Sequence, residues 1–414
     1  MEAASVRASS RATWGTPKQG VGPDPVKILV VHNHYREPGG EDENTRMEVR
    51  LLEAGGHLVV PFFLGNDDLR PGPISAGRSL WSRESYHALR RIIQHERPQV
   101  AHFHNTFHRI SPSGYWAAAA EDLPVVQTLH NYRLLCCNAQ LFRDGRPCQE
   151  CVGRRIPWPG VLHACYRDSI GASLAVSAVA SFHRALGTWR DRIDVYVALS
   201  EFARSLFVAA GISPAKIAIK PNPVFPDPGV GSGDGGFALF AGRLSPEKGI
   251  GTLLAAWKLL GPQIPLKIVG DGPLREQVAE ASKAAGVEWL GRRSLSEVYE
   301  LMGRARCVVV PSEWHEPFGR VVVEAFAKGT PVVASDAGAL AELVSDGLTG
   351  FHFRAGDPAD LARAVRCAFT RDTAVAAMRL QARKEYEARY TGTANCDLLT
   401  EIYSRAIAAR AAHR

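Results

Sequence analysis

Short runs of β-branched and other apolar residues recur along the chain, and stretches with helical spacing separate them. In the first half the runs fall at Lys27–Tyr35, His57–Phe63, Gln99–His104, Pro124–Leu129, Asp194–Leu199 and Ile217–Lys220. In the second half they fall at Phe237–Ala241, Leu266–Val269, Cys307–Pro311 and Pro331–Ser335. Such runs are typical of strands buried on both faces of a parallel sheet. The alternation predicts an α/β fold of two Rossmann-like, doubly wound domains that face a central cleft.

Glycines follow the first of these strands. Gly39 and Gly40 precede a helix whose apolar positions are Met47, Leu51 and Leu52. Ligands of open α/β sheets bind beyond the carboxyl ends of the strands, and glycine lets backbone amides approach a ligand closely. The pair therefore fits a ligand-binding turn or an ordinary tight turn, and the sequence favours neither.

Histidines gather at the same predicted sheet edge. His32 and His34 end the first strand, and His104 and His130 follow at the ends of later strands. His102 and His104 would share one side of a strand, which is compatible with a metal site. Because no nearby carboxylate completes a ligand set, we expect a polar cleft wall rather than a catalytic metal.

Five of the eight cysteines cluster in the insert 136–165. Cys148 and Cys151 form a C-x2-C pair, Cys136 lies upstream and Cys165 downstream, and Cys137 adjoins the first. Four thiolates at this spacing can close a tetrahedral structural zinc site, and free thiols are the alternative.

The composition changes to Pro, Gly, Ser and Asp after Asn222. This stretch contains a literal G-x-G-x-x-G, but it precedes a strand, whereas a dinucleotide site needs a strand before it and a helix after it. We predict a flexible tail (1–25), a first Rossmann-like domain (26–222), a linker (223–236), a second Rossmann-like domain (237–384) and C-terminal helices (385–414).

Two strand-to-helix segments of the second half carry candidate chemistry. Arg243 and Lys248 flank the loop after Phe237–Ala241, where a phosphate would also meet helix N-terminal amides. In PSEWHEPFGRVVVE, Glu316 lies in a loop and Glu324 lies in a helix that Gly319 opens. That helix is otherwise nearly apolar, so a carboxylate there is costly without a purpose, although a solvated helix face is the alternative.

Composition and charge add limits to this picture. The chain has 414 residues, 46% hydrophobic and 22% charged, with a net charge of +7. These values exclude a disordered chain and give no reason to expect nucleic-acid binding. No apolar run is long enough to span a membrane, and no secretory signal is recognisable. We therefore expect a cytoplasmic protein, with peripheral contact to the inner membrane face as a further expectation through the basic, aromatic stretch within 70–97.

The motifs together resemble the retaining GT-B glycosyltransferases of family 4. GRLSPEKG, IVGDGPL, VVVPSEWHEPFGRVVVEAFAKGTPVVAS and GLTGF occur in the family's order, and the first half agrees more loosely. The cysteine insert resembles one bacterial and archaeal branch, often linked to polysaccharide assembly, except that Cys137 stands where proline is common. The resemblance implies transfer of a sugar from a nucleotide-diphosphate sugar to a glycan or lipid-linked acceptor, with retention of anomeric configuration.

The resemblance implies that 26–222 is the acceptor-side domain, that 237–384 binds the nucleotide sugar, and that the C-terminal helices (385–414) cross back to the first domain. It also assigns roles to individual residues. It makes Glu316 and Glu324 the family's E-x7-E pair, for donor-sugar hydroxyls and for the ribose, and it places His130 near the reacting carbon. It implies a catalytic set of His130, Glu316, Arg243 and Lys248. It implies donor-binding residues Arg243, Lys248, Gly270, Glu316, Phe318, Gly319, Arg320 and Glu324, and acceptor-side residues Gly39, Gly40, His104 and Asn131.

The spacing of the aspartates leads us to expect sugar transfer without a catalytic metal. No aspartate lies two positions from another, so no Asp-x-Asp motif is present to hold a divalent ion. Arg243, Lys248 and the helix N-terminus would then stabilise the departing diphosphate in place of a catalytic metal. A nucleotide-sugar epimerase and a catalytically silent nucleotide-sugar-binding partner remain as alternative functions. A glycan phosphorylase is disfavoured, because it would require a longer chain with a pyridoxal site.

Overall fold

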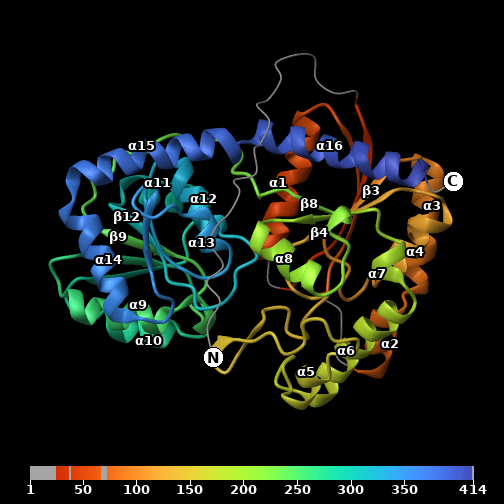
Figure 1. Cartoon of the computed structure of the whole chain (residues 1–414), viewed down its shortest axis with the longest axis horizontal. Coiled ribbons are helices and arrows are strands. Elements are labelled where there is room, and N and C mark those ends of the chain that lie inside the picture. The colour runs from red at the N-terminus through yellow and green to blue at the C-terminus, as the bar shows by residue number, and fades with distance from the viewer. Residues whose placement is uncertain (1–24, 37–38, 67–71, 413–414) are drawn as a thin grey trace, which may run out of the picture.

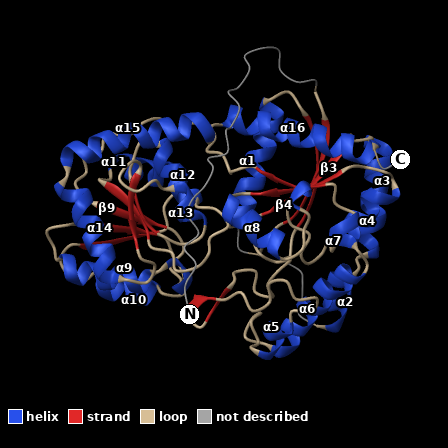
Figure 2. Cartoon of the chain, viewed as in Figure 1, coloured by secondary structure: helices blue, strands red, loops and turns tan. Residues whose placement is uncertain are grey.

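Two six-stranded parallel sheets organise the protein (Figure 1). The computed structural model describes residues 25–36, 39–66 and 72–412, so residues 1–24 of the predicted tail lie outside the described residues. Figure 2 shows the two sheets as separate bodies of strands, each enclosed by helices. The predicted α/β architecture of two doubly wound domains is confirmed.

The first sheet has the strand order β2-β1-β3-β4-β7-β8. Its strands are β1 (Lys27–Asn33), β2 (Leu58–Leu64), β3 (Val100–Phe103), β4 (Val125–Leu129), β7 (Val195–Ala198) and β8 (Ile217–Ile219). The second sheet has the order β11-β10-β9-β12-β13-β14. Its strands are β9 (Ala238–Ala241), β10 (Leu266–Val269), β11 (Val287–Gly291), β12 (Cys307–Val310), β13 (Val332–Ser335) and β14 (Gly350–Phe353). The insert adds a small antiparallel pair, β5 (Phe142–Arg143) and β6 (Arg146–Pro147).

Helices cover both faces of each sheet. In the first half they are α1 (Gly40–Ala54), α2 (Pro73–Leu80), α3 (Arg83–Glu96), α4 (Ser113–Ala120), α5 (Trp158–Leu162), α6 (Ile170–Ala185), α7 (Thr188–Asp191) and α8 (Glu201–Ala209). In the second half they are α9 (Ile250–Leu260), α10 (Arg275–Ala281), α11 (Leu295–Arg304), α12 (Arg320–Ala327), α13 (Ala339–Leu343), α14 (Pro358–Thr370), α15 (Asp372–Arg389) and α16 (Gly392–Ala411), with short 3₁₀ turns η1 (Pro214–Lys216) and η2 (Pro246–Lys248).

Two strands of the second sheet escaped the sequence analysis. β11 and β14 are the two edge strands of that sheet. An edge strand is only half covered, so β11 carries Glu288 and β14 carries His352 among its apolar residues. The continuous apolar run that marks a buried parallel strand is therefore missing from both.

The last two helices join the two halves. α15 packs on α12 of the second half, whereas α16 packs on β3, β4 and β7 of the first sheet. Leu399, Ile402 and Tyr403 of α16 are buried with Ile28 and Val30 of β1 in one core. The blue helices at the top of Figure 1 show this path, in which the C-terminal segment completes the N-terminal sheet.

Strand order reverses at equivalent places in the two sheets. β1 lies between β2 and β3, and β9 lies between β10 and β12. In each sheet the chain therefore first builds strands on one side of β1 or β9 and then crosses to build the strands on the other side. A crevice opens at such a switch point, outside the carboxyl ends of the strands. The candidate site residues lie in the segments that follow the carboxyl ends of strands in these two sheets.

Candidate functional site

The loops after β9 and β12 bring Lys248 and Glu316 together. Lys248 Nζ lies 2.7 Å from Glu316 Oε1, and Ser312 Oγ donates to the same oxygen. Glu316 is buried, whereas Lys248 is partly exposed and also lies over the Trp314 ring. Arg243 stands in the same loop as Lys248, exposed, and no other described side chain or carbonyl holds its guanidinium. The two loops thus present one cation that is ion-paired, Lys248, and one that is exposed to solvent, Arg243.

Glycine backbones hold these loops against one another. Gly249, which follows Lys248, has φ +70°, and a Cβ on it would lie 1.8 Å from the carbonyl oxygen of Pro311. Gly270, at the end of β10, has φ +138°, and its Cβ would lie 1.8 Å from the carbonyl oxygen of Gly242. Only glycine fits such approaches, so Gly270 contributes loop packing at the candidate donor site.

The helix α12 carries the second predicted carboxylate. Gly319 precedes its first residue, as predicted. Val322 N–H donates to the Gly319 carbonyl at 2.9 Å, whereas the N–H groups of Arg320 and Val321 have no acceptor among the described residues. Glu324 is buried, and Arg320 Nε donates to Glu324 Oε1 at 2.7 Å. Burial raises the pKa of Glu324, and the Arg320 charge acts against that rise. The spacing of four residues on one helix face could have indicated this pair from the sequence.

Phe318 is placed differently from its neighbours. Its side chain is buried in the core of the second half, with its ring centroid 6.4 Å from that of Tyr390. The structure therefore leaves the backbone of Phe318, rather than its ring, next to the opening of α12.

A buried carboxylate organises the histidines of the first sheet. Glu48 Oε1 of α1 lies 3.1 Å from His102 Nδ1 and 3.3 Å from His104 Nε2, and Lys220 Nζ binds its other oxygen at 2.8 Å. The expectation that no carboxylate lies near His102 and His104 is therefore wrong, because α1 folds a residue distant in sequence against β3. Although burial acts to raise the pKa of Glu48, Lys220 and the two histidines hold it well below its usual range.

This cluster also positions His130. His104 Nδ1 and His130 Nε2 are 2.9 Å apart, with their rings stacked at a centroid distance of 5.2 Å. Burial lowers the pKa of His104 to about 3, and burial lowers the pKa of His130 well below its usual range. Both imidazoles are therefore neutral at pH 7. Glu48, His102 and His104 are spaced for a metal ion, but the ammonium of Lys220 already neutralises Glu48.

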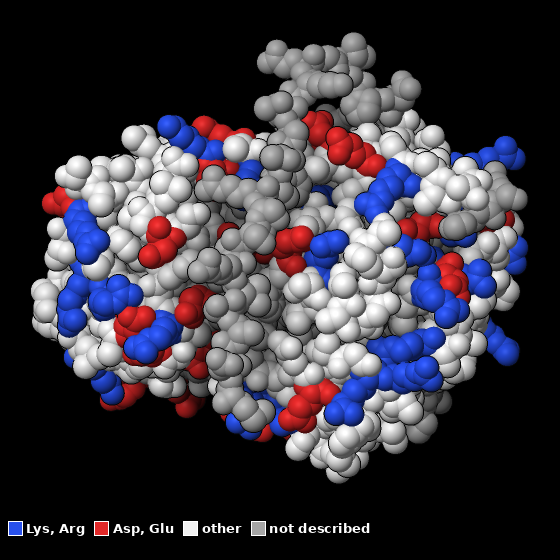
Figure 3. All heavy atoms as spheres, viewed as in Figure 1, with Lys and Arg blue, Asp and Glu red and all other residues white. Residues whose placement is uncertain are grey.

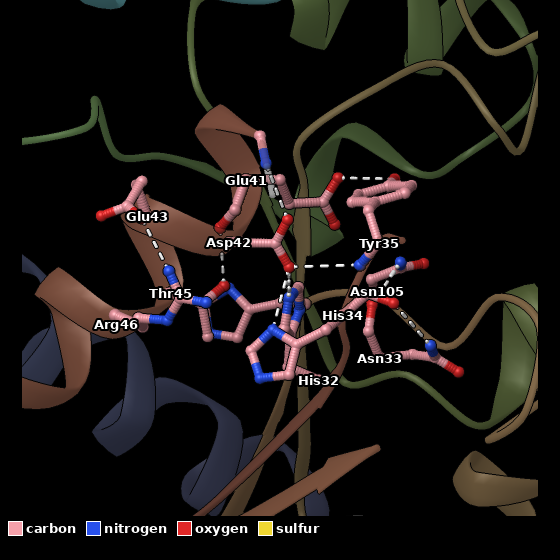
Figure 4. A network of polar contacts seen from close by, with 12 residues as sticks. His32, Asn33, His34, Tyr35, Glu41, Asp42, Glu43, Thr45, Arg46 and Asn105 are labelled. Atoms are coloured by element: carbon pink, nitrogen blue, oxygen red, sulfur yellow. Dashed lines mark hydrogen bonds and ion pairs between the residues drawn. The ribbon is translucent and has the colours of Figure 1, made fainter. Parts of the chain in front are cut away.

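A second polar network lies beside the predicted acceptor residues (Figure 4). Asp42 accepts from the Gly39 backbone at 3.0 Å, and its other oxygen lies 2.9 Å from both His32 Nε2 and His34 Nδ1. The sequence analysis did not include Asp42, although its position in the first turn of α1 is typical of a capping carboxylate. The same three side chains could also hold a metal ion.

Glu41 links this network to the predicted Asn131. Asn131 Nδ2 donates to Glu41 Oε2 at 3.1 Å, and Tyr35 Oη donates to the same oxygen at 2.9 Å. Burial raises the pKa of Glu41 to about 7. Gly40, the first residue of α1, is exposed. The four predicted acceptor-side residues thus fall at the ends of β1, β3 and β4.

His130 is one of the residues that line a pocket of the first half. Other lining residues are His104, Asn131 and Arg133, together with Val176 and Val179 of α6. Burial raises the pKa of Tyr132, and the charge of Glu316 adds to that rise. The loop that carries Glu316 in the second half therefore lies near the segment that follows His130 in the first.

The two halves also touch directly beside Glu316. Ser200 Oγ donates to the carbonyl of Pro317 at 2.8 Å. Glu342 of α13 accepts from the backbone N–H groups of Glu201 and Phe202 at 3.1 and 3.0 Å. A carboxylate of one domain therefore caps the first turn of α8 in the other.

Two thiols of the cysteine insert lie close to Gly160 of α5. A Cβ on Gly160 would lie 2.6 Å from Cys137 Sγ and 3.5 Å from Cys151 Sγ. Burial raises the pKa of Cys151 to about 11, and the charges of Cys136, Cys165 and Cys148 add to that rise. All five thiols are free, and the two metal-compatible triads among the described residues contain no cysteine.

Family comparisons match both halves of the chain. The family described as "Glycosyltransferase Family 4" matches residues 48–227, and "Glycosyl transferases group 1" matches residues 229–385. The chain belongs to the group 1, family 4 glycosyltransferases. No described helix has the length and apolar character that crossing a bilayer requires.

Individual members of the family are similar over part of their length. A lipopolysaccharide 1,2-N-acetylglucosaminetransferase of Salmonella typhimurium is 38% identical over 128 residues, 28% of this chain and 34% of that protein. A D-inositol 3-phosphate glycosyltransferase of Stackebrandtia nassauensis is 35% identical over 188 residues, 42% of each chain. The chain thus spans less than half of the length of these curated relatives.

Solved structures extend the likeness to the whole fold. HepE (Alr3699) of Anabaena, solved with UDP and with UDP-glucose, superposes with TM-scores of 0.65 and 0.64 at 19% identity. The superpositions cover 91% and 92% of this chain and 99% and 100% of HepE. The predicted GT-B fold is confirmed by this likeness.

Proposed function

We propose that this protein transfers a sugar from a nucleotide-diphosphate sugar to a glycan or lipid-linked acceptor, with retention of anomeric configuration and without a catalytic metal. The observation that carries the proposal is the ion pair of Lys248 with Glu316, which lies just before the N-terminus of α12, with Arg243 in the same loop as Lys248. Further support comes from HepE, a relative in fold that was solved with UDP-glucose.

The charges at this site suit the departure of a diphosphate. The hydroxyls of a bound donor sugar would donate to the Glu316 carboxylate in place of Lys248. The Lys248 ammonium would then be able to bind a phosphate oxygen. Arg243 and the first-turn amides of α12 supply further positive potential, and such fixed groups stabilise a leaving anion without reorganisation. The front face of the sugar would then meet His130, which the neutral His104 holds in place.

Ligand binding and turnover test the proposal together. A sugar nucleotide at a hundredfold excess over its dissociation constant should stabilise the folded protein by about 2.7 kcal/mol, so UDP-, GDP- and ADP-sugars can be compared by thermal shift. Donor hydrolysis should persist in EDTA and should fall about 10²- to 10³-fold in Glu316→Gln, with exposed Glu280→Gln as the matched control. Activity that disappears in EDTA and returns with magnesium contradicts the metal-free mechanism.

The same assay separates the alternatives. A silent nucleotide-sugar-binding partner would show the thermal shift without any turnover, and an epimerase would interconvert sugar nucleotides without releasing the nucleotide diphosphate. Release of nucleotide diphosphate with an α-linked product from an α-linked donor supports retaining transfer.

We also propose a structural zinc held by Cys136, Cys148, Cys151 and Cys165. The Cys151 thiol lies beside Gly160 of α5, and the insert is loop-rich, with left-handed Ala139, Leu141 and Ala164. A metal that binds thiolates would hold such a segment in shape. Elemental analysis of protein purified with thiol protection should find about one equivalent of zinc per chain, and Cys148→Ser/Cys151→Ser should lose it, whereas Cys367→Ser should not. Metal-free wild-type protein contradicts the proposal.

A further inference from the structure

The solvent-facing side of α6 is apolar along its whole length. The exposed positions recur every four residues: Ile170, Leu174, Ala178, Phe182 and then Leu186 just after the helix. Ile170 is 62% and Leu174 is 57% exposed. The polar residues Ser173, Ser177 and His183 point the other way and are buried. This arrangement is the reverse of an ordinary surface helix, whose polar face meets water.

The apolar surface continues onto the neighbouring helix α5. Ile156 is 58% exposed, Trp158 49% and Leu162 67%, and α5 packs on α6. Seven of the large exposed apolar residues of the described chain thus fall within 156–186. We call this set the α5–α6 face: Ile156, Trp158, Leu162, Ile170, Leu174, Phe182 and Leu186. In Figure 3 the lower tip of the molecule, where these helices lie, is mainly white.

Basic residues border the α5–α6 face. Arg154, Arg155 and Arg167 are exposed, and Arg154 lies 5.1 Å from the centre of the Trp158 ring. Asp168 is the single acidic residue within 152–187. An apolar surface with a tryptophan and a basic border matches the chemistry of an anionic lipid bilayer, where side chains enter the acyl region and arginines meet the headgroups.

The other side of the same helix reaches the candidate acceptor site. Val176, Val179 and Ala180 of α6 line the pocket that His130 and Asn131 border. One helix therefore separates the exposed apolar face from the acceptor-side pocket. A surface that docks on a membrane at this point would hold the pocket next to the bilayer.

We propose that the α5–α6 face docks on an anionic lipid bilayer and holds the acceptor-side pocket at the membrane surface. The inference rests on the proposed function only in that it places a lipid-linked acceptor there. The α5–α6 face is a different surface from the stretch within 70–97 that the sequence suggested. In that stretch, α3 buries Leu89 and Ile93 against the domain, as an ordinary surface helix does.

Vesicle flotation of the full chain tests the docking. The wild-type protein should float with vesicles of phosphatidylcholine and phosphatidylglycerol and should float less with phosphatidylcholine alone or at high salt. Leu174→Gln/Phe182→Gln should weaken binding to the anionic vesicles by roughly tenfold or more, because two apolar side chains no longer enter the bilayer. Leu259→Gln/Leu380→Gln is the matched control, since Leu259 is 54% and Leu380 69% exposed on the second domain.

Other results would overturn the docking. Wild-type protein that does not float, or a Leu174→Gln/Phe182→Gln variant that floats as well as the control, contradicts it. A concentration-dependent dimer that the same variant dissociates, without flotation, would assign the face to a second copy instead. Sugar nucleotides should still raise the unfolding temperature of the Leu174→Gln/Phe182→Gln variant. A wild-type protein that floats with vesicles but binds no sugar nucleotide would refute the proposed function and not the docking.

Discussion

Glu48 shows how much one buried side chain can determine. It is the counter-ion of Lys220, a fully buried lysine that also donates to Asn395 of α16, and it borders both His102 and His104. A buried ion pair adds little net stability compared with apolar packing, but loss of one partner leaves the other charge uncompensated. Glu48 thereby connects α1, β3, the end of β8 and the C-terminal helix.

We expect Glu48→Gln to destabilise the protein by about 3–5 kcal/mol, because Lys220 keeps a buried charge without a counter-ion. Urea unfolding measures the change. Glu53→Gln is the control, because Glu53 is exposed on the same helix, and it should change the unfolding free energy by less than about 0.5 kcal/mol. Equal stability of the two variants would show that the Lys220 charge is compensated elsewhere.

His108 predicts part of the acid sensitivity. Burial, then the charges of Arg133 and Arg167, lower the pKa of His108 from 6.5 to about 3. The unfolded chain therefore binds a proton between pH 6.5 and 3 that the folded chain does not, so stability falls as the pH falls through this window. His108→Gln should remove about 2 kcal/mol of the stability lost between pH 7 and 5, as measured by urea unfolding at both values. An unchanged pH dependence would mean that His108 titrates normally in the folded protein.

At the level of elements, the donor site depends on how closely loops approach. The loop after β9 carries Lys248, and it touches the loop after β12 because Gly249 has no side chain. The helix α12 then begins at the end of that second loop. The spacing of these loops, more than the helices behind them, sets the distance between Lys248 and Glu316.

Gly249→Ala should therefore cost more than about 1–3 kcal/mol and weaken donor binding, since the new methyl group meets Pro311 at a left-handed backbone position. Gly251→Ala is the matched control two residues later: it lies in α9 with open space around it, so alanine should be neutral or should stabilise by about 0.5–1 kcal/mol. Thermal unfolding with and without sugar nucleotide measures both effects. A Gly249→Ala protein as stable as Gly251→Ala would refute the close approach.

At the level of the whole molecule, contacts from distant parts of the chain hold the two domains together. α16 binds the first sheet from the far end of the chain, and Glu342 of the second domain caps α8 of the first. Ser200, the N-cap residue of α8, also donates to Pro317 next to Glu316. The relative placement of the two domains and the position of the Glu316 loop are therefore coupled through the start of α8.

Glu342→Ala should remove the acceptor of the Glu201 and Phe202 N–H groups, while the Ser200 cap stays, and should loosen the contact between the two domains, at a cost of about 1 kcal/mol. We expect a larger radius of gyration by small-angle scattering and a higher KM for the donor with little change in kcat, because closure rather than chemistry is affected. Glu280→Ala, an exposed residue on α10, is the control. A lower kcat at unchanged KM would place Glu342 in the chemical step instead.

The sequence alone determined the architecture. Apolar runs alternating with helical spacing gave ten of the strands of the two main sheets, because strands buried on both faces must be continuously apolar. It also located Gly319 at the start of a helix and Arg243, Lys248 and Glu316 at strand ends, since parallel sheets collect their carboxyl-end loops on one side. The edge strands β11 and β14 lack that apolar run and were missed.

Only the tertiary structure decided which of these residues meet. Glu48 is 54 residues before His102 and 172 before Lys220 in sequence, and no local pattern marks it as their partner. The outward apolar face of α6 was equally hidden, because periodicity shows that a helix has an apolar side but not whether that side faces the core or the solvent. Pairing of distant charges and the orientation of a helix are fixed by packing, which a one-dimensional pattern does not contain.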